Sequence, residues 1–309
     1  MTADFVTLNK LPEAGWDPII DAAGYPDALA ASLPFGEWVG KINELADALN
    51  GTTEVARFEG AELRKRQIAA GYTVEELEAI LHPMAEDGKE AIGSMGDDTP
   101  SAVLSDRYRP LSHFFRQNFS QVTNPPIDSL RERIVMSLQT NIGRESSLFD
   151  IGPQHAQQVI MNSPVLSQKK LRQLLGPDMY EKDYEFVDLN VDDSLSLPEA
   201  LDKICEQAES AVRNGKLIIM LSDRYLQPGK LPVHALLATG AVHHHLVAKG
   251  LRCDANIIVE TGVARDPHHF AGLIGYGATA VYPYLVYQSL HDIAQRDNID
   301  KQQQLGRSY

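Results

Sequence analysis

The sequence predicts an α/β fold, with a mostly helical N-terminal extension followed by a parallel sheet in a barrel or a doubly wound arrangement. In the first half, apolar residues recur every three or four positions, which is the spacing of amphipathic helices. From about residue 157, short apolar runs alternate with helical segments, as in a parallel sheet covered by helices. We therefore divide the chain into residues 1–156 and 157–309, and expect the two parts to form one integrated domain.

The N-terminal part is predicted to be helical from Asp27 to about Gly93. Helical spacing marks two segments, "GEWVGKINELADAL" and "TVEELEAILHPMAEDGKEAIG". Thr73, with Glu76 three residues later, is a capping-box start for the second segment. The Gly, Asp and Pro content of residues 94–111 predicts a loop. A short helix, "SHFFRQNFSQV", follows and ends at the paired prolines of "TNPPID".

The C-terminal part consists of predicted strand–helix units. The expected strands are "QQVIMNSPVLS", "YEFVDLN", "KLIIMLSDR", "ANIIVETG" and "AVYPYLVY". The expected helices between them are "QKKLRQLLG", "LPEALDKICEQAESAVRNG", "LPVHALLATGAVHHHLVAKG" and "DPHHFAGLIGYG". Because helices connect parallel strands, this order predicts a parallel sheet, either in a barrel or in a doubly wound arrangement.

Composition excludes several classes of partner. The formal net charge of −14 argues against a broad basic face for nucleic acid or an anionic membrane. No segment approaches the ~20 apolar residues that span a bilayer, and the N-terminus lacks a signal-peptide pattern. The two cysteines, Cys205 and Cys253, have no metal-binding spacing. We expect a soluble, cytoplasmic protein with no nucleic-acid, membrane or metal partner.

Three adjacent histidines, His243, His244 and His245, raise the question of a metal site. Consecutive helical residues point about 100° apart, so the three side chains cannot converge on one ion. None of them has a histidine or a carboxylate four residues away. His268 and His269 are likewise adjacent rather than staggered. The sequence therefore predicts packing or interface roles for all five, and no metal ligand.

Charged residues follow two of the predicted strands, in "LSDRYLQPGKLP" and "IVETGVARDP". Loops after parallel strands lie at the edge of the sheet where barrels place their active sites. The candidate residues at this rim are Asp223, Arg224, Glu260 and Arg265. A carboxylate beside a guanidinium is suited to anion binding or proton transfer, but it is also the usual composition of an ion pair between loops. An autonomous barrel enzyme acting on a small anionic substrate stays open as an alternative.

Motifs for cofactors and nucleophiles are missing from the sequence. The glycines of "GLIGYGATA" end a predicted helix and lead into a strand, whereas a dinucleotide fingerprint requires strand, glycines and then helix. Neither a P-loop nor a GxSxG elbow occurs. The motifs thus point to no catalytic and no cofactor-binding residue.

Long stretches of the chain carry a resemblance to a known family. They include "GYTVEELEAILHPMAEDGKEAIGSMGDDTPSAVLSDRYRPLSHFFRQNFSQVTNPPID", "NSPVLS" and "LLATGAVHHHLVAKGLRCDANIIVETGVARDPHHFAGLIGYGATAVYPYLVYQSL". On these, the chain resembles the central domain of the large (alpha) subunit of bacterial glutamate synthase, over essentially all of residues 1–309. That oxidoreductase makes L-glutamate from L-glutamine and 2-oxoglutarate.

The resemblance implies that the family's chemistry lies in other domains. The family's glutaminase domain uses an N-terminal cysteine, whereas this chain begins "MTADF". The family's FMN and 3Fe-4S sites lie in a later barrel domain with clustered cysteines. We therefore expect no catalytic residue and no cofactor in this chain, which is an enzyme only as part of its parent.

For this chain the resemblance implies a reduced or incomplete TIM-like β/α barrel as the fold, and a connecting role. It would link the glutaminase and FMN domains of the same parent chain, near the small flavoprotein subunit, and contribute to the ammonia tunnel between the two sites. The segment "QVTNPPID" resembles the part near the tunnel entrance, which makes Thr123, Asn124, Pro125 and Pro126 the tunnel or interface candidates. Two prolines stiffen such a loop, and backbone carbonyls accept hydrogen bonds from ammonia. A rigid loop that only fixes the spacing of domains is the alternative.

Overall fold

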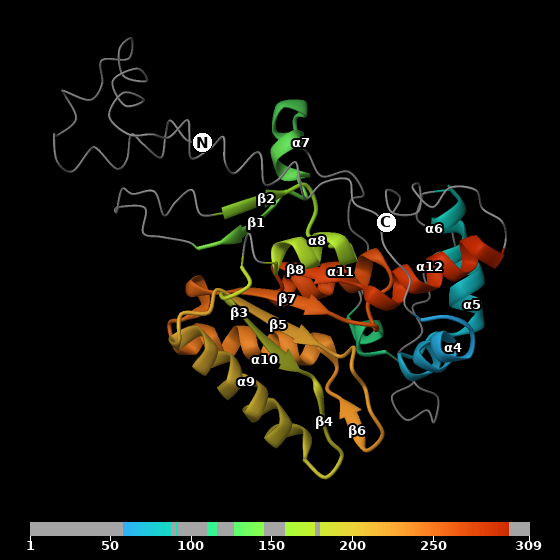
Figure 1. The fold of residues 1–309 in the computed structure, drawn as a ribbon. Coiled ribbons are helices and arrows are strands. Elements are labelled where there is room, and N and C mark those ends of the chain that lie inside the picture. Colours follow the sequence, from blue (N-terminus) through green and yellow to red (C-terminus); the bar gives the residue numbers. More distant parts are fainter. Residues whose placement is uncertain are drawn as a thin grey trace.

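Residues 58–87, 91, 110–115, 127–144, 158–176 and 180–296 are described by the structure, a computed structural model. Their centre is a four-stranded parallel sheet (Figure 1). Its strands, in spatial order, are β3 (Tyr184–Asp188), β5 (Ile218–Ser222), β7 (Asn256–Glu260) and β8 (Ala280–Tyr282). The register pairs Ser222 with both Asp188 and Glu260, so the carboxyl ends of three strands meet at one edge. The α/β class predicted from the strand–helix alternation is confirmed.

One face of the sheet is covered by the helices that connect its strands. These are α9 (Leu197–Arg213), α10 (Ala235–Ala248) and α11 (Pro267–Gly275). Alternate strand residues such as Ile219, Leu221 and Val259 are fully buried against them. Because α9 starts with a capping box between Ser196 and Glu199 and carries its apolar residues on one side, it forms a well-defined amphipathic cover.

The opposite face is covered by α8 (Gln168–Leu174) and α12 (Tyr284–Arg296). The other set of strand residues, including Met220, Ile258 and Tyr282, is buried there. Two-sided burial explains why the strands are continuous apolar runs rather than alternating ones. A closed barrel is not seen among the described residues, since β3 forms one edge of the sheet.

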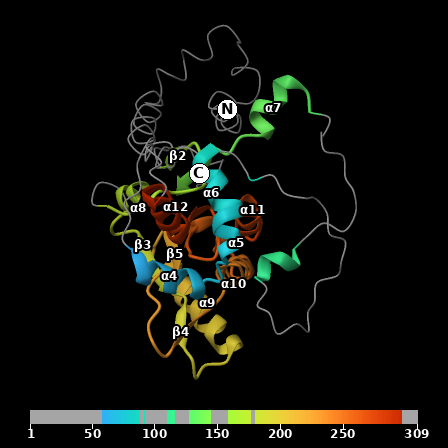
Figure 2. The ribbon, with the colours of Figure 1, turned by 90° about the vertical axis from the view of Figure 1, so that its right-hand side faces the viewer.

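The N-terminal helices pack on α12 rather than on the sheet. They are α4 (Gly60–Ala69), α5 (Val74–Glu76), the π-turn η1 (Leu77–Leu81) and α6 (His82–Asp87). Figure 2 shows α5 and α6 beside α12. The predicted capping box is confirmed, because the Glu76 amide donates to Thr73 Oγ1 at 3.1 Å and the Thr73 amide donates to Glu76 Oε2 at 2.9 Å. The helix that follows is interrupted by η1, which the apolar spacing did not reveal.

The segment before α8 returns to the far edge of the sheet. Val165 forms a parallel bridge with Val281 of the last strand, β8. The Val281 amide donates to Pro164 O, and the Leu166 amide donates to Val281 O, both at 2.8 Å. The first strand-like segment of the βα series therefore lies beside the last strand.

One predicted strand is partly wrong. "AVYPYLVY" forms a strand only over Ala280–Tyr282, and α12 begins at Tyr284. Pro283 cannot donate to a strand ladder, and its carbonyl instead accepts the amides of Val286 and Tyr287 at 3.1 and 3.3 Å. The proline thus ends the strand and starts the helix.

Several short elements lie outside the four-stranded sheet; residues 158–161 fall in the predicted strand "QQVIMNSPVLS", residues 111–114 overlap the start of the predicted helix "SHFFRQNFSQV", and the others were not predicted. Two antiparallel pairs flank the main sheet: β1 (Thr140–Gly143) with β2 (Gln158–Met161), and β4 (Asn190–Asp192) with β6 (Lys230–Pro232). The remaining elements are α7 (Ser129–Val135) and the 3-10 turns η2 (Leu111–Phe114) and η4 (Arg252–Asp254). No helix in the described ranges has the length and apolar character needed to cross a membrane. The predicted helix "GEWVGKINELADAL" lies outside the described residues.

Candidate functional site

The carboxyl edge of the sheet brings three of the four rim candidates together. Asp223 and Arg224 directly follow β5, and Glu260 is the last residue of the neighbouring strand β7. The backbone joins them too, since the Asp223 amide donates to Glu260 O at 3.2 Å. All three side chains are buried. Because β5 and β7 are parallel and paired in register, Arg224 and Glu260 are in direct contact although they lie 36 residues apart in the sequence.

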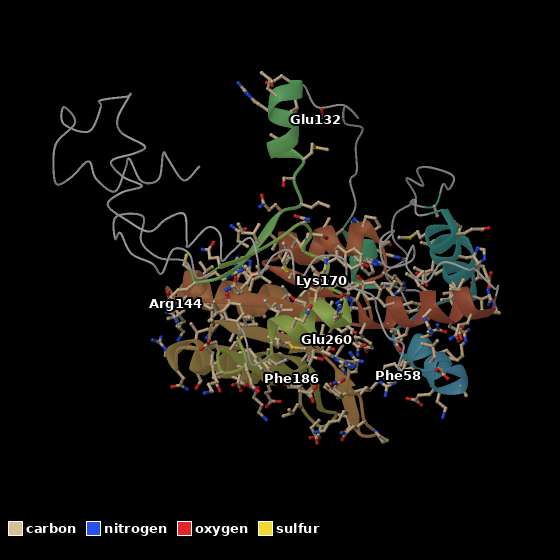
Figure 3. The ribbon with its side chains drawn as sticks, turned by 45° about the horizontal axis from the view of Figure 1, so that its top comes forward. Phe58, Glu132, Arg144, Lys170, Phe186 and Glu260 are labelled. Atoms are coloured by element: carbon tan, nitrogen blue, oxygen red, sulfur yellow. The ribbon has the colours of Figure 1, made fainter. Side chains whose placement is uncertain are left out.

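Arg224 and Glu260 form a buried ion pair. Arg224 Nη1 donates to Glu260 Oε1 at 2.8 Å, and Ser222 Oγ donates to Glu260 Oε2 at 2.5 Å. The exposed fractions of the two charged residues are 4% and 2%. The Arg224 guanidinium also lies 5.1 Å from the centre of the Tyr284 ring, within the range of a cation–π contact. Both carboxylate oxygens of Glu260 thus accept hydrogen bonds inside the protein. Figure 3 marks the position of Glu260 within the fold.

Asp223 organises the loop after β7. Its carboxylate accepts hydrogen bonds from Thr261 Oγ1 at 2.5 Å and from the Gly262 amide at 2.9 Å. Burial raises the pKa of Asp223 to about 6, although these hydrogen bonds act in the opposite direction. The side chain therefore holds the β7 loop against the β5 loop.

Arg265 is used elsewhere, at the junction with the N-terminal helices. Its Nε and Nη2 donate to Glu76 Oε1 at 2.9 and 2.8 Å. The same guanidinium donates to the carbonyls of Ala70 and Gly71 just past the end of α4. Arg265 also lies 4.6 Å from the centre of the Tyr72 ring. This set of contacts ties the β7 loop to α4 and α5.

The adjacent histidines have separate partners. His243 Nδ1 accepts from Arg252 Nε at 3.0 Å, while His245 Nε2 lies 2.6 Å from Glu209 Oε2 on α9. His268 Nε2 lies 3.0 Å from Ser112 O. In the part of the chain that the structure describes, no group of three His, Cys, Asp or Glu side chains is arranged to hold a metal ion.

His269 is buried, and its titration is expected to affect stability. Its Nδ1 accepts the Arg265 amide at 3.2 Å, which requires an unprotonated nitrogen. Burial lowers the pKa of His269 from 6.5 to about 4. Between these values the unfolded chain binds more protons than the folded one, so this residue's contribution to stability falls as pH falls from about 6.5 to about 4.

We expect His269→Gln to remove that loss, because glutamine keeps an acceptor for the Arg265 amide but does not titrate. Urea unfolding at pH 7, 5.5 and 4 should show the unaltered chain losing on the order of 2–3 kcal/mol more than the variant. The raised pKa of Asp223 changes stability in the opposite direction over the same pH range, but this effect is common to both proteins. His244→Gln, at an exposed position, is the matched control. Parallel pH profiles for the unaltered chain and His269→Gln would contradict the assignment.

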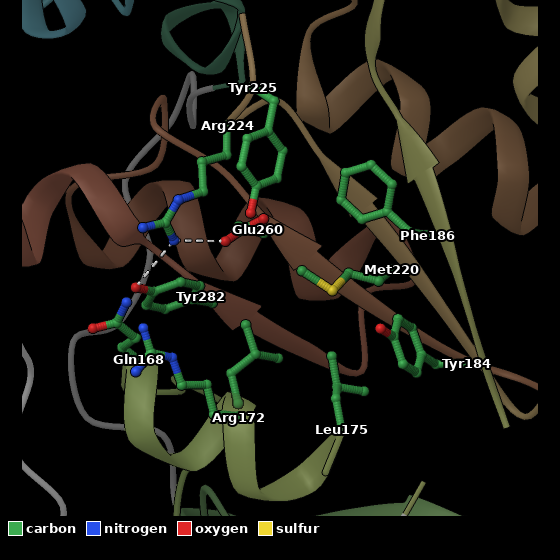
Figure 4. Close-up of a pocket in the computed structure, with 11 residues that line it drawn as sticks. Gln168, Arg172, Leu175, Tyr184, Phe186, Met220, Arg224, Tyr225, Glu260 and Tyr282 are labelled. Carbon is green, nitrogen blue, oxygen red and sulfur yellow. Dashed lines mark hydrogen bonds and ion pairs between the residues drawn. The ribbon is translucent and has the colours of Figure 1, made fainter. Parts of the chain in front are cut away.

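A pocket of about 450 Å³ lies between α8 and one face of the sheet, and it reaches the carboxyl edge at Arg224 and Glu260 (Figure 4). Arg224 and Glu260 lie in its wall together with residues that the sequence did not single out. Those on α8 or at its C-terminal end are Gln168, Leu171, Arg172 and Leu175, and those on or after the strands are Tyr184, Phe186, Met220, Tyr225 and Tyr282. The i, i+4 spacing of Gln168 with Arg172 was a signal available in the sequence, but only the position of α8 shows that the two face the sheet edge.

The tunnel candidates Thr123, Asn124, Pro125 and Pro126 lie outside the described residues. Of the two cysteines, Cys205 is buried in α9 and Cys253 is exposed. Two thiols at such different positions do not supply the ligand set of an iron–sulfur cluster.

Comparison with known proteins decides the family. A family model described as "Glutamate synthase central domain" matches residues 65–309. The chain belongs to the glutamate synthase central domain family. Among its relatives, the large chain of glutamate synthase [NADPH] from Azospirillum brasilense is 46% identical over 277 residues, which are 87% of this chain and 18% of that protein.

Other relatives of this glutamate synthase central domain come from distant organisms. The ferredoxin-dependent glutamate synthase 2, chloroplastic, of Arabidopsis thaliana is 42% identical over 84% of this chain and 16% of its own length. The glutamate synthase [NADPH] large chain of Bacillus subtilis is 38% identical over 88% of this chain and 18% of its own length. The chain thus spans less than a fifth of the length of these relatives.

Proposed function

We propose that this central domain is a connecting part of glutamate synthase that is not catalytic by itself. The relatives are named as glutamate synthases and are several times longer, which supports further domains in the same parent chain. The observation that supports the proposal most is that the charged residues at the rim are paired inside the domain. Glu260 is paired with Arg224 and Ser222, Asp223 with Thr261 and Gly262, and Arg265 with Glu76, so each charge stabilises the domain itself. The alternative, an autonomous enzyme acting through these residues, has less support.

The fold is proposed to be an incomplete β/α barrel. The helices α9, α10 and α11 follow consecutive parallel strands and cover one face, as the outer helices of a barrel do. The Val165 segment beside β8 places the first strand of the series next to the last, which a barrel also requires. A single integrated domain is supported by the packing of α4 on α12 and by the Arg265–Glu76 ion pair.

FMN and the 3Fe-4S cluster are proposed to lie elsewhere in the parent. The two cysteines do not fit a cluster, as described above. In the described ranges, the pocket wall offers a paired carboxylate and no glycine-rich turn between a strand and a helix that would cradle a phosphate. These observations support cofactor sites in another domain, close to the small flavoprotein subunit that the family resemblance implies. The cytoplasmic location also remains a prediction.

The isolated chain is expected to be colourless and to lack a site for the parent's substrates. We expect no visible flavin absorbance after purification, and no change in melting temperature with 2-oxoglutarate, L-glutamate or phosphate. A specific ligand at 100 times its dissociation constant would add about 2.7 kcal/mol of stability. A yellow preparation with stoichiometric FMN, or a shift with 2-oxoglutarate, would favour the autonomous enzyme instead.

The ammonia-tunnel role is proposed for Thr123, Asn124, Pro125 and Pro126. We expect Pro125→Ala/Pro126→Ala, made in a glutamate synthase containing this segment, to loosen the loop and release ammonia before it is used. The measurement is the ratio of glutamine hydrolysed to glutamate formed, which should rise several-fold together with free ammonia. Lys203→Ala, on the exposed side of α9, is the control and should keep the ratio unchanged. An unchanged ratio with loss of both activities would instead support a loop that only fixes domain spacing.

A further inference from the structure

Helix α7 and the residues that follow it, together residues 129–138, expose large apolar side chains to solvent. We propose that this segment, the α7 arm, inserts into an apolar groove of a neighbouring domain of the same parent chain. The inference rests on the connecting role proposed above, because it names a surface through which this domain would hold its neighbour. It adds to that role the residues of the surface and the chemistry of the partner.

The apolar side chains of the α7 arm lie largely in solvent. Their exposed fractions are 88% for Leu130, 57% for Val135, 65% for Met136 and 65% for Leu138. Among the described residues, neither of the two apolar cores includes a side chain of α7. One exposed leucine is ordinary on a protein surface, but several large apolar side chains gathered in one short segment mark an interaction surface.

These side chains project from different sides of the helix. Val135 and Met136 lie roughly 140° and 240° around the helix axis from Leu130, because each residue turns the helix by about 100°. Met136 still belongs to the last helical turn, since its amide donates to Glu132 O at 2.8 Å. One flat surface cannot cover side chains that point apart in this way, whereas a groove covers several sides of a helix at once. The shape of the partner surface is therefore a groove.

The base of the arm is fixed to the domain. The strand that follows the arm, β1, pairs with β2, and its Ile142 is fully buried. Tyr180 Oη donates to Ile142 O at 3.2 Å, and Asn256 Nδ2 donates to Gly143 O at 2.9 Å. Figures 1 and 3 both show α7 standing away from the sheet beyond this anchor. An arm that is held at its base loses less conformational freedom on binding than a free segment would.

Charge does not dominate recognition by the arm. The sequence "DSLRERIVMSL", residues 128–138, contains two acidic and two basic side chains, so the segment has no net charge in a chain whose formal charge is −14. Arg131 Nε pairs with Asp128 Oδ2 at 3.2 Å within the segment itself. The arm therefore offers its partner apolar surface, which makes an apolar groove the complementary chemistry.

A neighbouring domain of the parent chain fits this arm better than a second copy of the chain does. The chain spans only 16–18% of the length of its relatives, so most of such a protein lies outside it. Domains of one polypeptide meet at a high effective concentration, so a small contact is enough to hold them together. Interfaces between separate chains typically use about 20–30 residues a side, which is more than this arm supplies.

The first test replaces Leu130 by the photo-crosslinking residue p-benzoylphenylalanine in a glutamate synthase that contains this segment. We expect crosslinks, identified by mass spectrometry, to residues outside those that match positions 1–309. Hydrogen exchange of the amides of residues 130–138 should also be at least about 100-fold slower in that enzyme than in the isolated chain. Crosslinks only to this domain, in the same copy or in a second one, or equal exchange in the two proteins, would overturn the proposal.

The second test is the variant Leu130→Asp/Met136→Asp. In the glutamate synthase it should speed the exchange of the arm to within about threefold of the isolated chain, because carboxylates are not tolerated in an apolar groove. In the isolated chain it should change the melting temperature by no more than about 2 °C, since both side chains are already exposed there. A larger fall in the isolated chain would show that the chain itself covers the arm, and would overturn the proposal.

Two control variants separate apolar character from added charge. Leu130→Met/Met136→Leu keeps the apolar surface and should keep the slow exchange in the glutamate synthase. Lys203→Asp, at an exposed position of α9, adds a carboxylate away from the arm and should also keep it. Slow exchange that survives Leu130→Asp/Met136→Asp contradicts docking through these side chains. The flavin and ligand tests of the isolated chain do not depend on the arm, so the two proposals fail separately.

Discussion

Glu260→Ala is expected to lower the free energy of unfolding by about 3–5 kcal/mol, because it leaves the Arg224 guanidinium buried without its counter-ion. Arg224 is 4% exposed, so water cannot replace the lost carboxylate without local opening of the sheet edge. Ser222 Oγ loses its acceptor as well. Urea unfolding at pH 7, followed by far-UV circular dichroism, measures the change.

The matched control is Glu62→Ala, which breaks the exposed i, i+4 ion pair with Arg66 on α4. Its cost should stay below about 1 kcal/mol, since water solvates both charges. The double variant Arg224→Met/Glu260→Leu should recover at least part of the loss, because it removes both buried charges together. Equal effects of Glu260→Ala and Glu62→Ala would show that the buried pair is not the structural element inferred here.

Gly277→Ala is expected to destabilise the chain by about 3 kcal/mol or more, from backbone strain and overpacking together. Gly277 has a φ of +110°, a backbone conformation that residues other than glycine rarely adopt. An added Cβ would also lie 2.8 Å from the Cβ of His243, an atom fixed by helix α10. The melting temperature and the midpoint of urea unfolding should both fall.

Gly250→Ala separates strain from crowding. Gly250 has a φ of +68°, but an added Cβ there meets no atom within 4 Å, so a cost of only about 1 kcal/mol is expected. His243→Ala/Gly277→Ala should recover only part of the loss, because it removes the contacts with the imidazole ring but leaves the contact with the Cβ at position 243. If Gly277→Ala costs no more than Gly250→Ala, the close approach of the helix to this turn is not rigid.

The elements that the sequence predicted are those with strong local signals. The apolar runs of β5 and β7, the amphipathic α9 with its capping box, and the Thr73 capping box all appear where expected. The strands β4 and β6 are three residues long and are stabilised by pairing with each other. Such pairing is a property of the tertiary structure, so local periodicity could not reveal it.

The candidate site was predictable to a similar extent. That Asp223, Arg224 and Glu260 meet follows from the positions of these residues at the ends of neighbouring parallel strands. The contact of Arg265 with Glu76 could not be predicted in this way, because Glu76 lies 189 residues earlier, on α5 among the N-terminal helices. The pocket was also missed, since it depends on where α8 lies relative to the sheet.

The bridge between Val165 and Val281 has a consequence for synthesis on the ribosome. The segment that leads into α8 is translated early, yet its hydrogen-bonding partner is the last strand of the sheet. The same holds for α4, whose partner α12 follows that strand. Neither segment can pack in its final position until the end of the sheet has left the exit tunnel of the ribosome. Final assembly of this domain is therefore a late and cooperative event during translation.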